Sequence, residues 1–138
     1  MSIAIEEQTV VDSVPKKLYI GGEWRDATGA ATLHVIDPAT EESLAEVADA
    51  TPEDAMTALD AAVAKQAEWG ASAPNDRAGI LWHAFELMVE RADELALLMT
   101  LEMGKPVAES KAEIIYAADF FRWFSGEALR IDGNYKQF

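Results

Sequence analysis

The sequence contains no cysteine and few basic residues. Without a thiol, the chain forms no disulfide, offers no thiolate ligand to a metal and has no cysteine nucleophile of its own. Lysine and arginine number 11 against 25 acidic residues, which gives a formal net charge of −14 at pH 7. This charge is unsuited to nucleic acid, whose phosphates bind Lys and Arg, and is typical of a solvated, soluble surface. The absence of cysteine also agrees with a reducing compartment, so we expect a cytoplasmic protein.

Long hydrophobic runs are also missing from the sequence. No apolar run approaches the roughly 20 residues that a helix needs to span a bilayer. Residues 1–17 carry acidic residues before the first lysine and have no continuous apolar block, which argues against a secretory signal. We therefore expect no association with a membrane.

The common signatures of cofactor and metal sites are absent as well. The chain has neither a G-x-G-x-x-G nor a G-x-x-x-x-G-K-[ST] sequence. His34 and His83 have no second ligand at a spacing suited to a metal, which favours structural roles for both. Glu86, Glu90 and Glu94 follow one another at four-residue intervals, and their mutual repulsion indicates a solvated helix face instead of a general acid–base pair.

A chain of 138 residues amounts to about one domain with a real core. Residues 1–16 are polar and have no sustained period, so we expect a flexible leader before the ordered part of the chain. The runs at 17–20, with a turn at Gly21-Gly22, and at 32–36 predict two short strands joined by a loop at 26–29. Residues 43–48 alternate apolar and polar side chains, which predicts a third strand.

Three helices are predicted after the strands. The first begins at Thr51, where an N-cap threonine, a proline and an acid at the third position are start signals, and it ends at Gly70. Its predicted buried side consists of Ala55, Leu59, Ala62, Val63 and Ala67. The second begins at Pro74 and stops at the Gly104-Lys105-Pro106 sequence. Its apolar stripe consists of Leu81, Ala84, Phe85, Met88, Ala92, Leu95 and Met99.

The third helix, predicted from about residue 107 to 129, is apolar around most of its circumference. Ile114, Ala118, Phe121 and Ala128 share one face, whereas Tyr116, Phe120, Trp123 and Phe124 occupy much of the rest. Such a helix needs cover on several sides, and three short strands and two helices provide little of it. We therefore expect exposed aromatic surface on this helix. The alternative is that Phe120, Trp123 and Phe124 pack onto the first two helices.

Five segments in order resemble the N-terminal part of an NAD(P)-dependent aldehyde dehydrogenase. They are LYIGGEW at 18–24, VIDPAT at 35–40, ERADELA at 90–96, TLEMGKP at 100–106 and EIIYAA at 113–118. The segment FRWFSGEA at 121–128, followed by RIDG at 130–133, is most similar to succinate-semialdehyde dehydrogenases. Three positions depart from the family pattern: Glu41 replaces a glycine, Trp82 a basic residue and Gly126 an acid.

The resemblance implies an α+β segment, with short N-terminal strands followed by three helices, from an aldehyde-dehydrogenase-like α/β fold. Residues 17–138 would be the N-terminal part of the cofactor-binding domain, and thus an incomplete Rossmann-type domain. The implied reaction is a hydride transfer, in which a cysteine thiolate attacks the aldehyde and NAD or NADP takes the hydride. A water activated by a base then releases the acid. The family's cysteine, its base and its dinucleotide-binding strands lie beyond the equivalent of Phe138, so we assign no catalytic or cofactor-binding residue here.

Two further sites are carried over from the family. Glu113, Phe120 and Phe124 match positions that border the substrate entrance. Val35 and Ile36, through their carbonyls, and Glu102, through its carboxylate, match a monovalent-cation site, and oxygen ligands suit a hard cation. The alternative for Glu102 is a plain surface ion pair with Lys105.

The resemblance therefore implies a fragment of an oxidoreductase, which oxidises succinic semialdehyde to succinate when complete. The fragment alone is expected to be inactive and to bind no cofactor. Its expected partners are the remainder of the aldehyde dehydrogenase chain, a small aldehyde and other copies in a homo-oligomer. The alternative is a non-catalytic interaction module that pairs with a partner through the third helix.

Overall fold

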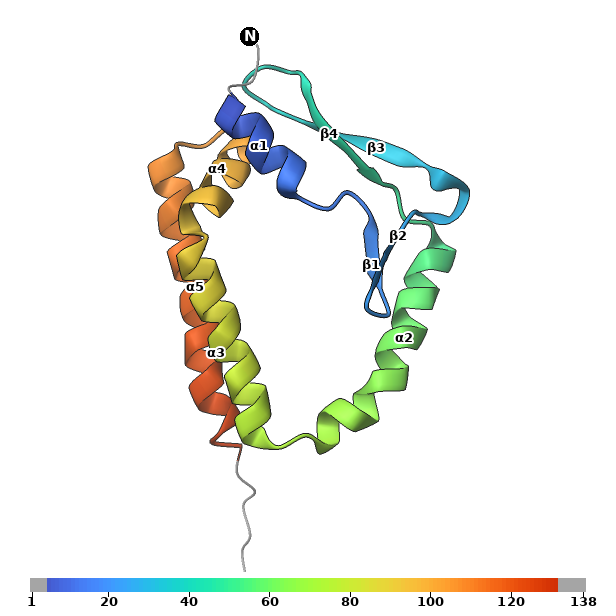
Figure 1. Cartoon of the computed structure of the whole chain (residues 1–138), viewed down its shortest axis with the longest axis vertical. Helices are drawn as coiled ribbons and strands as arrows, with labels where there is room; N and C mark the ends of the chain where they lie inside the picture. Colours follow the sequence, from blue (N-terminus) through green and yellow to red (C-terminus); the bar gives the residue numbers. More distant parts are fainter. Residues whose placement is uncertain (1–4, 132–138) are drawn as a thin grey trace, which may run out of the picture.

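The computed structural model describes residues 5–131. The elements in this range are α1 Ile5–Ser13, β1 Leu18–Ile20, β2 Glu23–Arg25, the 3₁₀ turn η1 Thr28–Ala30, β3 Thr32–Ile36, β4 Ser43–Ala48, α2 Pro52–Ala71, α3 Pro74–Glu90, α4 Ala92–Met103 and α5 Val107–Ala128. They follow one another around a ring, with α2 on one side and the adjacent pair α3 and α5 on the other (Figure 1). The α+β class is confirmed, although α1 and the division of the second helix were not predicted.

The strands form two separate antiparallel hairpins. β1 pairs with β2 across Gly21 and Gly22, which have φ values of 66° and 92° that glycine adopts without strain. β3 pairs with β4, with an irregular register between Val35 and Ile36. The two runs on either side of residues 26–29 are therefore not partners. The first run folds back on itself across Gly21 and Gly22 to form β1 and β2, and the second run pairs with β4.

Asp37 organises the turn between β3 and β4. Its buried carboxylate accepts hydrogen bonds from the Ala39 amide at 2.8 Å and the Thr40 hydroxyl at 3.1 Å. Glu41 follows with a φ of 63°, in the left-handed region that favours glycine. The departure from the family's glycine at this position therefore places a side chain on a strained backbone, and the hydrogen bonds of Asp37 help to hold it.

The helix α2 begins where the sequence predicts it. The Thr51 hydroxyl accepts a hydrogen bond from the Asp54 amide, and the Asp54 carboxylate accepts one from the Thr51 amide, which completes a capping box. The predicted buried side is wrong, because all five of its members are exposed in this structure: Ala55, Leu59, Ala62, Val63 and Ala67. Among residues 5–131, the main neighbour of α2 is β1, which covers only part of the helix.

The single helix predicted between Pro74 and Gly104 is two helices, α3 and α4. Arg91 separates them with φ −97° and ψ 16°, which takes the backbone out of the helical conformation. Its guanidinium pairs with Glu94 in the first turn of α4 at 2.8 Å. The predicted apolar stripe is nevertheless correct, because every member from Leu81 to Met99 is buried or half-buried.

Gly104 ends α4 as predicted. It has a φ of 74°, and its amide donates to the Thr100 carbonyl at 2.8 Å. A Cβ at this position would lie 3.0 Å from Cγ of Pro38. Glycine at this position therefore allows the left-handed turn that ends α4, and it leaves room for the β3–β4 connection to pack closely against that turn.

Small buried side chains join α5 to α3 and α4. The Ser125 hydroxyl donates to the Ala78 carbonyl of α3 at 2.8 Å. The hydroxyls of Ser110 and Thr100 of α4 lie 2.9 Å apart. Ala118, which lies between Ser110 and Ser125 on α5, is fully buried. Small residues allow the helix backbones to approach closely, and the two hydroxyl contacts fix their alignment.

Residues 5–13, which belong to the expected leader at residues 1–16, form the helix α1. Residues 1–4 lie outside the described range. Val11 is buried against Leu44 of β4 and Leu101 of α4. This tertiary contact, and not a helical period in the sequence, holds the segment in place.

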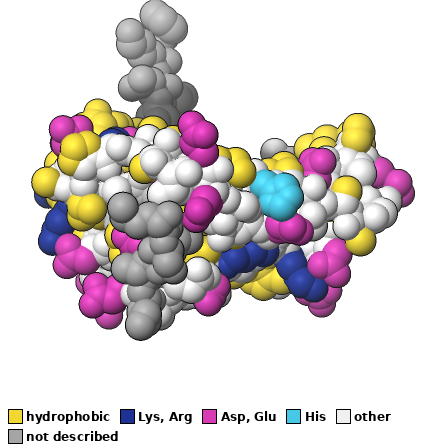
Figure 2. All heavy atoms as spheres, turned by 90° about the horizontal axis from the view of Figure 1, so that it is seen from above, with side chains coloured by type: hydrophobic (Ala, Val, Ile, Leu, Met, Phe, Trp, Pro, Cys, Tyr) yellow, Lys and Arg dark blue, Asp and Glu magenta, His cyan; other side chains and the backbone are white. Residues whose placement is uncertain are grey.

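Acidic side chains are spread over the face shown in Figure 2, with hydrophobic side chains exposed between them. Within residues 5–131, no helix is long and apolar enough to cross a membrane.

Candidate functional site

The aromatic side of α5 is exposed, as the sequence predicts. Phe120, Trp123 and Phe124 keep 48%, 64% and 53% of their surface accessible, so the alternative of packing onto the other helices is wrong. Together with Asp119 they line an open hollow of about 350 Å³. Tyr116 extends the aromatic surface by an edge-on contact with Phe120, with the ring centroids 5.1 Å apart.

Glu113 does not belong to this hollow. It is exposed and forms an ion pair with Lys105, at the start of the α4–α5 connection. Of the three predicted entrance residues, the structure brings Phe120 and Phe124 together and leaves Glu113 apart. Trp123 and Asp119 complete the lining and were not predicted as site residues, although their spacing from Phe120 and Phe124 on one helix would have placed them there.

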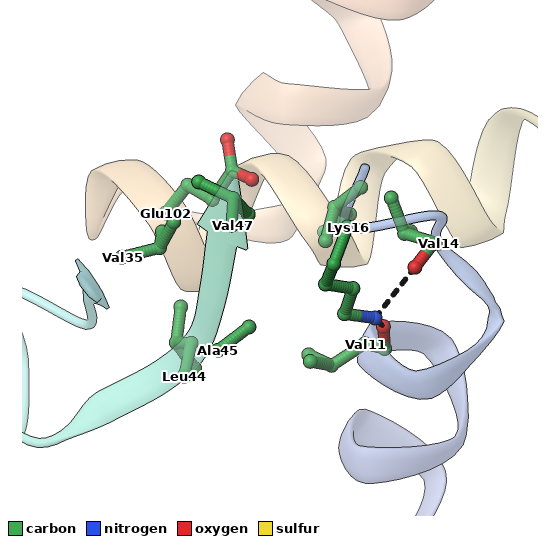
Figure 3. Close-up of a pocket in the computed structure, with 9 residues that line it drawn as sticks. Val11, Val14, Lys16, Val35, Leu44, Ala45, Val47 and Glu102 are labelled. Carbon is green, nitrogen blue, oxygen red and sulfur yellow. Dashed lines mark hydrogen bonds between the residues drawn. The ribbon is translucent and has the colours of Figure 1, made fainter. Parts of the chain in front are cut away.

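The predicted cation ligands Val35 and Glu102 line one small pocket (Figure 3). It holds about 40 Å³, room for little more than one or two water-sized groups. Most of its lining is apolar and comes from α1, the connection that follows α1, β3, β4 and α4: Val11, Val14, Lys16, Val35, Leu44, Ala45, Val47, Leu98 and Glu102. Ile36, the third predicted ligand, is not part of this lining.

Two charged residues of opposite sign line this pocket. The Lys16 ammonium donates to the Val14 carbonyl at 2.6 Å and also to the Val11 carbonyl, at the end of α1. The Glu102 carboxylate points away from Leu44 (Figure 3). Within residues 5–131 Glu102 has no ion-pair partner, and Lys105 binds Glu113 instead. The predicted alternative, a Glu102–Lys105 pair, is therefore wrong.

In the described part of the chain, no group of three or more His, Asp and Glu side chains is placed to hold a metal ion. His34 lies 3.0 Å from the Ser43 hydroxyl and 3.7 Å from Glu46 on the paired strand. His83 lies 3.7 Å from Glu86, one turn along α3. Both histidines make the local surface contacts expected of structural residues.

Among residues 5–131, the largest pKa shift lies at a helix start and not in the hollow or the pocket. Hydrogen bonds from the amides of Thr51 and Thr28 hold the pKa of Asp54 far below its ordinary value. A hydrogen bond from Arg91 lowers the pKa of Glu94 in the same way. Both carboxylates stabilise connections between elements, so the shifts indicate structural groups here.

The glycines at turns in the described range do not have the arrangement of a dinucleotide-binding turn. In dinucleotide-binding folds, a glycine-rich turn leads from a parallel strand to a helix N-terminus, where the pyrophosphate binds. Here Gly21 and Gly22 join two antiparallel strands, and Gly104 ends a helix.

A family model described as "Aldehyde dehydrogenase family" matches residues 24–138. The chain belongs to the aldehyde dehydrogenase family. It is 54% identical over 92 residues to a succinate-semialdehyde dehydrogenase of Paenarthrobacter nicotinovorans, a match that covers 67% of this chain and 20% of the relative. It is 44% identical over 119 residues to the NADP(+) succinate-semialdehyde dehydrogenase of Escherichia coli, covering 86% of this chain and 25% of the relative.

Solved structures agree with this family assignment. The succinate-semialdehyde dehydrogenase of Burkholderia pseudomallei superposes with a TM-score of 0.85 at 43% identity, over 88% of this chain and 25% of that one. An aldehyde dehydrogenase of Brucella melitensis gives a TM-score of 0.87 at 34% identity, over 96% of this chain and 27% of that one. The chain thus spans a fifth to about a quarter of the length of the relatives it matches.

Proposed function

We propose that this chain is the N-terminal framework segment of an NAD(P)-dependent aldehyde dehydrogenase that oxidises succinic semialdehyde to succinate. The observation that carries the proposal is the similarity to enzymes named succinate-semialdehyde dehydrogenase, at 54% and 44% identity. NAD and NADP are both candidates, because the Escherichia coli relative is named for NADP(+) and a betaine aldehyde dehydrogenase of similar fold was solved with NAD+. In the complete enzyme the cofactor would accept a hydride from the substrate.

The segment itself contributes structure and no catalytic group in this proposal. The 138 residues contain no cysteine, and a thiolate is the nucleophile that the family resemblance implies. The exposed faces of α2 and α5 then pack against the remainder of the enzyme. Covering each large apolar side chain stabilises the complete protein by on the order of 1.5–3 kcal/mol. Phe120 and Phe124 would border the substrate entrance, and the complete enzyme is proposed to be a homo-oligomer.

The experiment is an activity assay on the purified 138-residue chain. The protein is incubated with succinic semialdehyde and either NAD or NADP, and reduced cofactor is followed by its absorbance. We expect no turnover above a blank without protein, because no thiohemiacetal forms without a thiol. Turnover above the blank that remains after repeated purification would contradict the assignment of a framework role.

A monovalent-cation site at Glu102 is a second part of the proposal. Val35 and Glu102 line one pocket, and Glu102 has no ion-pair partner among residues 5–131. An acid in the last turn of α4 faces the negative end of the helix dipole, which a bound potassium or sodium ion would offset. Lys16 opposes this with a positive charge on the same pocket, so the complete enzyme must supply further oxygen ligands.

The test of the cation site uses a complete enzyme that carries this segment. Thermal stability is compared in potassium, sodium and a bulky organic cation, for the parent and for Glu102→Gln. We expect potassium or sodium to raise the melting temperature of the parent only. Equal melting temperatures in all three salts, or an unchanged cation effect in Glu102→Gln, would rule the site out.

The exposed aromatic surface of α5 favours one alternative, a non-catalytic module that pairs through this helix. A module of this kind would associate with itself or with a partner through Trp123 and Phe124, which are both more than half exposed. Two measurements together distinguish the framework segment from the module. The first is sedimentation of the 138-residue chain over a concentration series. The second is the activity of a complete enzyme that carries the segment. If the chain is a non-catalytic module, it should form a defined oligomer in sedimentation, and a complete enzyme that carries the segment should have no dehydrogenase activity.

A further inference from the structure

The aromatic hollow on α5 contains a single charged group. Phe120, Trp123 and Phe124 supply three rings, and within residues 5–131 Asp119 is the one charged side chain of the lining. This side chain is 51% exposed. Like charges a few ångströms apart repel each other even in water. An uncompensated Asp119 would therefore oppose any second carboxylate that entered the hollow.

Arg122 compensates this charge from the next turn of α5. Its Nε donates to Oδ1 of Asp119 at 2.9 Å. The three-residue spacing makes the two side chains neighbours on the helix surface. Arg122 is not part of the lining of the hollow. Its positive charge therefore acts on the hollow through Asp119 and not through direct contact.

The Asp119–Arg122 pair contributes little to holding α5 in place. Exposed ion pairs add little to stability, because water already solvates both charges. The helix is aligned instead by the buried Ser125 hydroxyl on the Ala78 carbonyl and by Ser110 beside Thr100. Replacement of Arg122 should therefore change the charge beside the hollow and leave the packing of the helices intact.

The proposed substrate carries a negative charge of its own. Succinic semialdehyde is a short aldehyde with a carboxylate at its other end, which is ionised at neutral pH. The chain has a formal net charge of −14, so its overall field does not attract such a molecule. Compensation of the acid nearest the three rings is the local means of admitting it.

We propose that Arg122 is a specificity-determining residue, which neutralises Asp119 and so lets the hollow admit an aldehyde that carries a carboxylate. Arg122 touches neither the substrate nor the reacting atoms in this account, and acts as a positioning residue on Asp119. The proposal rests on the proposed function, because it takes the hollow as the border of the substrate entrance in the complete enzyme.

The test uses a complete enzyme that carries this segment. KM and kcat are measured for succinic semialdehyde and for butanal, a neutral aldehyde with the same number of carbon atoms. Arg122→Gln removes the positive charge, Arg122→Lys keeps it, and a double variant combines Arg122→Gln with Asp119→Asn. Lys111→Gln is the matched control, because it takes a positive charge from an ion pair with Asp93 on the same helix. Lys111 lies roughly 16 Å from Arg122 along the helix axis.

Arg122→Gln should raise KM for succinic semialdehyde by about two- to fivefold at low salt, because Asp119 is then uncompensated. The increase should shrink at about 1 M salt, where the Debye length is about 3 Å. It should be confined to KM and to the charged aldehyde, with kcat unchanged. Arg122→Lys and the double variant should return KM to the parent value, and Lys111→Gln should keep it there.

Three results with an active parent enzyme would overturn the charge role of Arg122. The first is an unchanged KM for succinic semialdehyde in Arg122→Gln. The second is a raised KM that the double variant does not restore, because Arg122 would then bind the substrate directly. The third is an equal increase for butanal, which would show a structural effect. An inactive parent enzyme would contradict the proposed function itself and this proposal with it, so the two failures are distinguishable.

Discussion

The carboxylate of Asp54 ties the start of α2 to a loop 26 residues earlier in the chain. It accepts hydrogen bonds from the Thr28 amide at 3.0 Å and the Thr28 hydroxyl at 2.8 Å, in addition to the Thr51 amide at 2.9 Å. The side chain is 1% exposed. A buried carboxylate with this set of donors stays ionised, and the donors lose their partner when it is protonated or replaced.

These contacts predict that stability falls in acid. The pKa of Asp54 is lower in the folded protein than in the unfolded chain, so its contribution is fully present above pH ~4, the ordinary pKa of an aspartate. It is lost as the pH falls below that value towards the lower folded pKa. Asp54→Asn should lower the melting temperature at pH 7 and weaken its dependence on pH below ~4. Glu53→Gln, at the exposed neighbour, is the control, and the same acid dependence in parent and Asp54→Asn would contradict the assignment.

Two glycines predict opposite effects of the same substitution. Gly104 has a φ of 74° and lies against Pro38, so Gly104→Ala should destabilise the chain by at least ~1–2 kcal/mol. Gly79 lies inside α3, where an added Cβ would meet no other element within 4 Å, so Gly79→Ala should stabilise the chain by ~0.5–1 kcal/mol. Urea denaturation of both variants gives the comparison. Destabilisation by Gly79→Ala, or none by Gly104→Ala, would contradict the role assigned to that glycine.

At the scale of elements, the sequence predicts the helical periodicity and the helix termini better than it predicts which helix faces are buried by neighbouring elements. The capping box at Thr51 and Asp54 and the stop at Gly104 depend on local hydrogen bonds and backbone geometry, so they are visible in the sequence. A helical period shows which side chains share a face, but burial also requires a neighbour. This is why Leu59 and Val63 of α2 share an apolar face that is exposed in residues 5–131.

Two other element-scale features depend on contacts between distant residues. The break at Arg91 interrupts a continuous apolar stripe, and the side chains on both sides still reach the core. The helix α1 has a weak period, and Val11 is held by Leu44 and Leu101, which are distant in sequence. Among the candidate site residues, Phe120 and Phe124 share one helix and were predicted together. Glu113 is on the same helix, but its ion pair with Lys105 could not be read from spacing alone.

The exposed aromatic surface of α5 predicts strong binding of a hydrophobic dye. Replacing Trp123 and Phe124 together by glutamine should reduce the dye fluorescence, because these side chains form much of the open hollow. The stability of the chain should change by no more than ~0.5 kcal/mol per residue, because both side chains are largely exposed. Phe85→Gln, at a half-buried position of α3, is the contrasting variant and should destabilise. Unchanged dye binding after the double substitution would place the hydrophobic surface elsewhere.

At the scale of the whole molecule, the chain is about a quarter of the length of its aldehyde dehydrogenase relatives and matches that part of the fold closely. TM-scores of 0.85 and 0.87 over 88% and 96% of its residues show that the arrangement of hairpins and helices is that of the family. The apolar faces of α2 and α5 and the absence of a cysteine fit a segment that supports chemistry performed by other parts of an enzyme. The proposed framework role therefore makes a direct prediction about a complete enzyme.

The most direct measurement is the activity of a chimera. Residues 18–131 of this chain replace the matching segment of the Escherichia coli NADP(+) succinate-semialdehyde dehydrogenase, to which the chain is 44% identical. We predict a folded chimera that reduces NADP with succinic semialdehyde, and that loses this activity when the host's catalytic cysteine is replaced. A soluble, folded chimera without dehydrogenase activity would contradict the account, because the segment would then not support the chemistry of this family.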